Sequence, residues 1–144
     1  MERRNQPVGF IIKQINNVYE KDLNERLKTL GITSSQCAVL DFLFHSNKDE
    51  ISQRDIEKGL SLKNPTVTGL LKRLDEKGFI LCVPNKTDKR KNNIYLTEKA
   101  FDVQKRMEAD RKKMDRMLTI GMTKKEIQST LKGLNKMLYN IQDP

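Results

Sequence analysis

The chain contains no tryptophan, one histidine and only two cysteines among its 144 residues. Cys37 and Cys82 lie far apart without CxxC spacing, in apolar stretches, which argues against a disulfide framework or a zinc cluster. The single histidine, His45, has no cysteine or carboxylate cluster at ligand spacing, so no metal site and no Ser/His/Asp catalytic set is expected. A glycine-rich phosphate loop is also missing. We therefore predict no cofactor, no metal and no enzymatic activity.

Long apolar runs are missing too. No segment approaches the roughly 20 residues that a membrane-spanning helix needs. The first residues, Met1 to Gln6, lead into no signal-peptide core. Together with the low cysteine content, this predicts a soluble cytoplasmic protein without a membrane partner.

Positive charge, in contrast, is abundant. The chain has 28 lysines and arginines against 19 acidic residues, a formal net charge of +9. A polyanionic partner is therefore favoured, with nucleic acid first and an anionic membrane surface second. The length suits one domain.

Residues 64–97 predict a helix that leads directly into a basic hairpin. Asn64, as the N-cap, and Pro65 are typical of a helix start. Gly78 is typical of a helix end. The buried stripe between them recurs at spacings of three and four residues: Val67, Leu70, Leu71 and Leu74.

The hairpin consists of two strand-like runs, Phe79 to Val83 and Ile94 to Leu96, joined by a polar loop. That loop carries four cations against one acid: Lys86, Lys89, Arg90 and Lys91 against Asp88. On composition alone a solvated loop and a DNA contact are about equally plausible. Ile51 is expected to add a short strand beside the hairpin.

Five further helices are predicted around this stretch, over residues 10–30, 34–45, 52–60, 97–121 and 123–141. Three of them begin with a capping box, in which two residues satisfy each other's backbone donors: Thr33 with Gln36, Ser52 with Asp55, and Thr123 with Glu126. The second helix is apolar on all sides and is predicted to be the central core helix. Residues 61–63 form the short turn of a helix-turn-helix unit.

The first helix and the last two carry apolar stripes that one small head cannot bury. A second copy of the chain is the simplest partner, which predicts a homodimer. The residues assigned to dimerisation are Ile11, Ile127, Leu131, Leu134, Leu138 and Ile141.

The motifs together resemble the MarR family of bacterial winged helix-turn-helix regulators. Residues 88–97 match that family's pattern of Asp-x-Arg, five residues, then Leu-Thr, and residues 65–68 and 74–80 resemble its recognition helix and exit. The resemblance covers nearly the whole chain. It implies a mainly α fold with a small β-wing: one MarR-like domain over residues 1–144, with a winged helix-turn-helix head at 33–97 and dimerisation helices at 6–30 and 98–142.

The resemblance implies that each recognition helix enters a major groove of double-stranded DNA and each wing an adjacent minor groove. Arg90 would suit a narrow minor groove, with Asp88 holding its guanidinium. Where many family members carry arginine this chain has Gly69, which removes one base contact. The predicted DNA contacts are Asn64, Pro65, Thr66, Thr68, Gly69, Lys72 and Arg73 on the helix and Lys86, Asp88, Lys89, Arg90 and Lys91 on the wing.

The function predicted from this resemblance is a bacterial, nucleoid-associated regulator, a homodimeric repressor of a pseudo-palindromic operator, relieved by a small aromatic or phenolic anion. Its effector cleft is assigned to Ile15, Tyr19, Arg26, Cys37 and Met107. Peroxide-sensing relatives carry their cysteine in the first helix, where this chain has none, so packing is the favoured role for both thiols. An architectural DNA binder without an effector and a dimeric protein-binding adaptor remain open.

Overall fold

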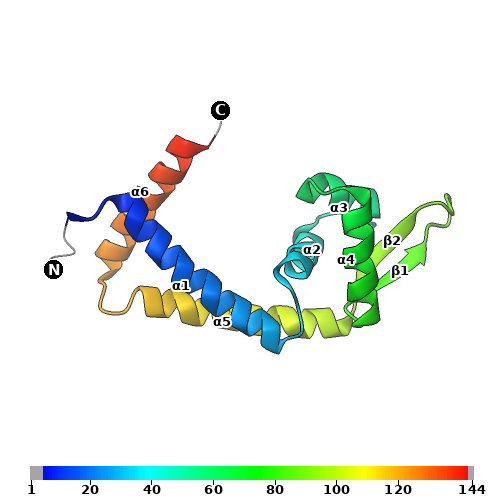
Figure 1. The fold of residues 1–144 in the computed structure, drawn as a ribbon, viewed down its shortest axis with the longest axis horizontal. Helices are drawn as coiled ribbons and strands as arrows, with labels where there is room; N and C mark the ends of the chain where they lie inside the picture. Colours follow the sequence, from blue (N-terminus) through cyan, green and yellow to red (C-terminus); the bar gives the residue numbers. More distant parts are fainter. Residues whose placement is uncertain (1–4, 143–144) are drawn as a thin grey trace. The chain divides into compact units, whose positions relative to one another are not determined.

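The computed structural model describes residues 5–142, which form six helices and one two-stranded antiparallel sheet (Figure 1). The helices are α1 (Val8–Thr29), α2 (Ser34–His45), α3 (Gln53–Leu60), α4 (Asn64–Glu76), α5 (Glu98–Leu118) and α6 (Lys124–Ile141), and the strands are β1 (Ile80–Pro84) and β2 (Asn92–Leu96). This order confirms the predicted fold class, mainly α with a small β-wing.

The described chain divides into two compact units, with the boundary between Arg106 and Met107 inside α5. The first unit holds α1 to α4, both strands and the start of α5. The second holds the rest of α5 and α6. In the part of the chain that the structure describes, no helix is long and apolar enough to cross a membrane.

Two of the predicted capping boxes are present in full. The Thr33 hydroxyl accepts from the Gln36 N–H and the Gln36 side chain accepts from the Thr33 N–H, both at 3.2 Å. Ser52 and Asp55 make the same reciprocal pair at the start of α3. At α6 the Thr123 hydroxyl accepts from the Glu126 N–H, but among the described residues the Glu126 side chain makes no return bond to the Thr123 N–H.

The prediction that Asn64 caps α4 was wrong by one residue. Lys63 is the N-cap, with extended backbone, and its carbonyl accepts the first helical bond from Val67. Asn64 is therefore the first helical residue and its side chain is directed to α3. Pro65, the second, is tolerated because N–H groups in the first turn have no partner within the helix.

Left-handed glycines follow three helices as the sequence predicted. Gly31, Gly78 and Gly121 have φ angles of 71°, 80° and 77°, a region in which a Cβ atom is disfavoured. The turn between α3 and α4 uses Ser61 instead, with φ 53°. This non-glycine residue in left-handed conformation had no signal in the sequence.

The core of the first unit lies between α2, α3, α4 and the sheet. Val39 and Leu40 of α2 are essentially inaccessible, and α2 contacts α1, α3, α4 and β2, which confirms its predicted central place. On α4 three members of the predicted stripe are buried, Val67, Leu71 and Leu74. Leu70, the fourth, is only half-buried. The helix thus packs one face inward and leaves the other to solvent.

The wing is a regular hairpin, with Ile80 opposite Leu96 and Pro84 opposite Asn92. The predicted pairing with Ile51 occurs as one bridge rather than a strand. Ser52 pairs with Asn93, and the Ile94 N–H donates to the Ile51 carbonyl at 2.8 Å. This bridge joins β2, close to the loop end of the wing, to the residue that precedes α3.

Candidate nucleic-acid interface

The seven residues predicted to contact DNA from α4 are all solvent-exposed: Asn64, Pro65, Thr66, Thr68, Gly69, Lys72 and Arg73. They face away from the buried stripe of the same helix. A Cβ atom built on Gly69 would meet nothing within 4 Å. The missing side chain therefore leaves open space on the outer face and no gap in the core.

A second helix orients part of this face. The Gln53 side-chain amide, on α3, donates to the Thr68 hydroxyl at 2.8 Å and lies 3.5 Å from the Asn64 carbonyl. The Asn64 amide in turn donates to Glu57 at 3.5 Å. Sequence reasoning missed Gln53 because no local pattern links residues fifteen positions apart.

The C-terminal end of α4 is also held by hydrogen bonds. The Lys77 ammonium donates to the Gly31 carbonyl at 2.6 Å and to the Gln36 side-chain oxygen at 2.8 Å. Gln36 is buried, with 1% of its surface exposed. The α1–α2 turn and the end of α4 are therefore joined through one ammonium group.

The wing tip is organised by Asn85, which the sequence analysis also missed. Its side-chain oxygen accepts from the backbone N–H groups of Thr87 and Asp88 and from the Thr87 hydroxyl. Its amide donates to the buried Asn93 at 3.3 Å. An Asx-type turn of this kind gives a polar loop a defined shape without a core.

Arg90 and Asp88 form the pair that the sequence suggested. One oxygen of Asp88 accepts from the Arg90 backbone N–H at 3.1 Å and from its side-chain Nε at 3.3 Å. The Arg90 side chain is 92% exposed. Because Asp88 uses Nε, the two terminal nitrogens of the guanidinium still point to solvent with four N–H donors.

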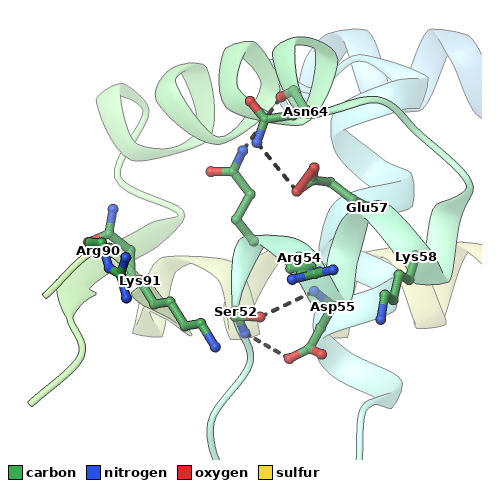
Figure 2. Close-up of a pocket in the computed structure, with 10 residues that line it drawn as sticks. Ser52, Arg54, Asp55, Glu57, Lys58, Asn64, Arg90 and Lys91 are labelled. Carbon is green, nitrogen blue, oxygen red and sulfur yellow. Dashed lines mark hydrogen bonds between the residues drawn. The ribbon is translucent and has the colours of Figure 1, made fainter. Parts of the chain in front are cut away.

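A groove of about 440 Å³ lies between α3, the start of α4 and the wing (Figure 2). Arg90 and Lys91 line it from the wing, and Arg54 and Lys58 line it from α3. Sequence reasoning assigned nothing to α3, because two cations in a short amphipathic helix are indistinguishable from an ordinary solvated face.

Comparison with known proteins decides the family. Residues 22–117 match the family described as transcriptional regulator SarA/Rot. The chain belongs to the SarA/Rot family. This family assignment and the fold confirm the MarR-like winged helix-turn-helix resemblance, and they make the protein a DNA-binding transcriptional regulator rather than an enzyme.

Solved structures similar to this SarA/Rot chain include MepR, a transcription regulator of the Staphylococcus aureus multidrug efflux pump MepA. MepR shares 25% sequence identity over 95% of this chain and 100% of its own, with a TM-score of 0.83. A crystal structure of the S. aureus MepR–DNA complex matches at 26% identity, over 94% of this chain and 97% of that chain, with a TM-score of 0.67.

The two cysteines of this SarA/Rot protein lie in different surroundings. Cys37 is buried and its thiol lies 3.8 Å from Asp41. Cys82 is exposed on β1, so the expectation of an apolar environment was wrong for it. All four residues of β1 that follow Ile80 are exposed. Partial desolvation by nearby atoms, with a smaller effect of Asp75, still raises the pKa of the Cys82 thiol.

The residues assigned to an effector cleft lie on three helices, α1, α2 and α5. Ile15 is exposed, Tyr19 is half-buried, and Arg26 forms an ion pair with Asp22. Met107 belongs to the second compact unit.

His45 is exposed at the end of α2, where its ring lies 2.8 Å from the Asp41 carbonyl.

Proposed function

We propose that this SarA/Rot-type regulator is a homodimeric repressor that binds a pseudo-palindromic operator. The supporting observation is that α4 presents its polar and basic face outward, beside a wing that carries Arg90 at its tip. A helix of this kind reads base edges in the major groove, while arginine suits a narrow minor groove. In this proposal Thr66 and Thr68 face bases, and Lys72 and Arg73 neutralise phosphates.

The remaining helix and wing candidates act in the same interface. Asn64, Pro65 and Gly69 allow close approach of the start of α4 to the DNA. On the wing, Asp88 positions Arg90, and the neighbouring cations add sequence-independent attraction to phosphates. These cations are Lys86, Lys89 and Lys91.

Exposed apolar residues support a second copy of the chain. Ile11 on α1 is 39% exposed, and on α6 Leu131, Leu134, Leu138 and Ile141 are 55%, 42%, 51% and 80% exposed. Ile127 is half-buried. In the proposed dimer, residues 6–30 and 98–142 form the interface and residues 33–97 form the head. The two-fold symmetry then requires two half-sites about one helical turn apart.

A small aromatic anion is proposed to relieve repression. The ligand would act by binding better to the form of the dimer that cannot hold both half-sites. Arg26 would supply the positive charge, together with the apolar residues assigned above. Because Arg26 is paired with Asp22 and Cys37 is buried, the ligand would have to displace existing contacts.

The test is a gel-shift assay with the promoter of the protein's own gene against a scrambled duplex of equal length, combined with sedimentation of the free protein. The proposal requires a dimer and a clear preference for the promoter. Equal binding to both duplexes would instead indicate an architectural DNA binder, and no DNA binding would indicate a protein adaptor. Titrating salicylate-like compounds into the same assay tests the effector, because the repressor should release DNA.

A further inference from the structure

The loop of the wing, residues 85–91, has no apolar packing that could hold it in one shape. Every residue in it is polar or charged, and none is buried. Fixing the backbone of such a loop costs conformational entropy. Burial of apolar side chains does not offset that cost here, so hydrogen bonds have to define the loop.

These hydrogen bonds begin at a buried residue of the sheet. Asn93 on β2 is 7% exposed and forms the bridge with Ser52. Its side-chain oxygen accepts from the Asn85 amide at 3.3 Å. The Asn85 backbone N–H also donates to the Lys91 carbonyl at 2.8 Å. Asn85, the first residue of the loop, is therefore held through both its side chain and its backbone.

The Asn85 side-chain oxygen then holds the residues that follow. It accepts from the Thr87 N–H at 2.9 Å and from the Asp88 N–H at 3.2 Å. Asp88 in turn accepts from the Arg90 N–H and Nε. A continuous series of hydrogen bonds thus runs from the buried Asn93 through Asn85 and Asp88 to the guanidinium.

The last member of this series is the side chain that needs order most. Arg90 is long and 92% exposed, so packing does not restrict it. Immobilising such a side chain when a partner binds costs affinity, and restricting it beforehand reduces the cost. The bonds to Asp88 restrict Arg90 in the free protein, and Asn85 fixes the backbone of Asp88.

We propose that Asn85 is a positioning residue for DNA binding, which fixes Asp88 and thereby presents Arg90 in one orientation before DNA binds. This inference rests on the proposed function, since it assumes that Arg90 enters the minor groove. Asn85 touches no DNA in this proposal and supplies no charge. Its effect on affinity passes entirely through the arginine.

A double-mutant cycle of Asn85→Ala and Arg90→Ala in the full-length protein tests this dependence on the promoter duplex. With Arg90 present, Asn85→Ala should weaken binding by about two- to tenfold per subunit, the cost of ordering one long side chain. In the Arg90→Ala background it should have no effect, because no guanidinium remains to be positioned. The salt dependence should stay that of the parent, because Asn85→Ala removes no charge.

Nuclear magnetic resonance of the free protein gives a measurement that does not depend on DNA. The exchange of the Arg90 Nε–H with water should become faster in Asn85→Ala and stay slow in Asn85→Asp, which keeps the accepting oxygen. The control is Asn92→Ala in the same wing. Asn92 is exposed, and within residues 5–142 its side chain makes no hydrogen bond, so the exchange rate should not change.

An equal loss of affinity in both backgrounds would overturn the inference, because Asn85 would then act on the whole wing and not on Arg90. Unchanged exchange in Asn85→Ala would overturn it too, as would an equal increase in Asn92→Ala or in Asn85→Asp. Thermal melting verifies that the variants fold. If the parent shows no promoter preference, the proposed function fails, yet the exchange rates still decide whether Asn85 positions Arg90.

Discussion

Helices α4 and α6 both carry apolar residues at helical spacing, but only α4 buries them within its own chain. Leu74 on α4 is completely inaccessible, whereas Leu131 on α6 is 55% exposed. Among its described residues α6 has none that is buried. An apolar stripe in the sequence thus indicates that a helix face must pack against another surface. The structure shows whether the same chain provides that surface.

The two helices also differ in the source of their stability. The head completes its core with α2, α3 and the wing, so it is expected to fold regardless of oligomeric state. In the proposed dimer, the α6 stripe is buried on association, and each Å² of apolar surface removed from water contributes roughly 25 cal/mol.

Replacing Leu134 and Leu138 by lysine should disrupt the proposed dimer, because unpaired charges are costly to bury in a dimer interface. We expect monomers by sedimentation, and an operator affinity lower by about 10² to 10⁴, the advantage of bivalent binding. The matched control is Gln128→Lys with Asn135→Lys, which adds equal charge at exposed polar positions of α6. A dimer that survives the leucine changes would show that this stripe is not the interface.

Arg90→Ala should weaken operator binding by about 1 to 3 kcal/mol if the arginine contacts base edges. The dimer should remain intact, because Arg90 lies on the wing and not on a terminal helix. Arg90→Lys keeps the charge but loses the planar guanidinium group. Relative to Arg90→Ala, it should recover only the part of the binding free energy that comes from attraction to phosphates. Unchanged affinity of the alanine variant at matched salt would contradict the role of the wing.

Gln53→Ala should cost about 0.5 to 1.5 kcal/mol of operator affinity, the net worth of one hydrogen bond. The loss should come from a Thr68 hydroxyl that is no longer held in one orientation. A double-mutant cycle with Thr68→Val measures this coupling. Additive losses in the cycle would mean that Gln53 acts without Thr68.

Asp55→Ala tests the stability of the head by itself. Hydrogen bonding from the Ser52 N–H, with help from Lys48, holds the pKa of Asp55 below its ordinary value of 3.8. A lowered folded pKa adds stability above pH 3.8 that is lost as the pH falls through the folded value. In urea unfolding, the variant should be less stable by about 0.3 to 1.5 kcal/mol at pH 7.

The difference in unfolding free energy between the parent and Asp55→Ala should disappear at acidic pH. Asp49→Ala, an exposed acid in the preceding loop, serves as the control and should leave the unfolding curve in place. A gap that stays constant down to pH 2 would mean that the Asp55 charge contributes nothing.

Local signals in the sequence were sufficient for most of the fold. Capping at Thr33 and Ser52 and the helix stop at Gly78 depend only on residues within four positions. The helix ends at these places could therefore be predicted closely. The N-cap of α4 was misplaced because Asn64, a favoured capping residue, is bound to Glu57 on the neighbouring helix. A capping preference read from the residue type does not reveal a contact with another helix.

The contacts that shape the candidate site join residues that are far apart in the chain. Gln53 reaches Thr68, and Lys77 reaches Gln36 across 41 positions. Their partners are chosen by packing of the helices, which a periodic pattern does not specify. The outward face of α4 followed from its stripe, whereas the residues that orient that face required the structure.

The single bridge between Ser52 and Asn93 has a mechanical consequence. Because it ties β2 to the start of α3, we expect it to limit movement of the wing against the helix-turn-helix unit and to set the spacing between α4 and the wing before DNA binds. Under the proposed function, the DNA has to conform to that spacing. Operators should then be ranked partly by how easily their sequence bends or narrows, including at base pairs that no side chain touches.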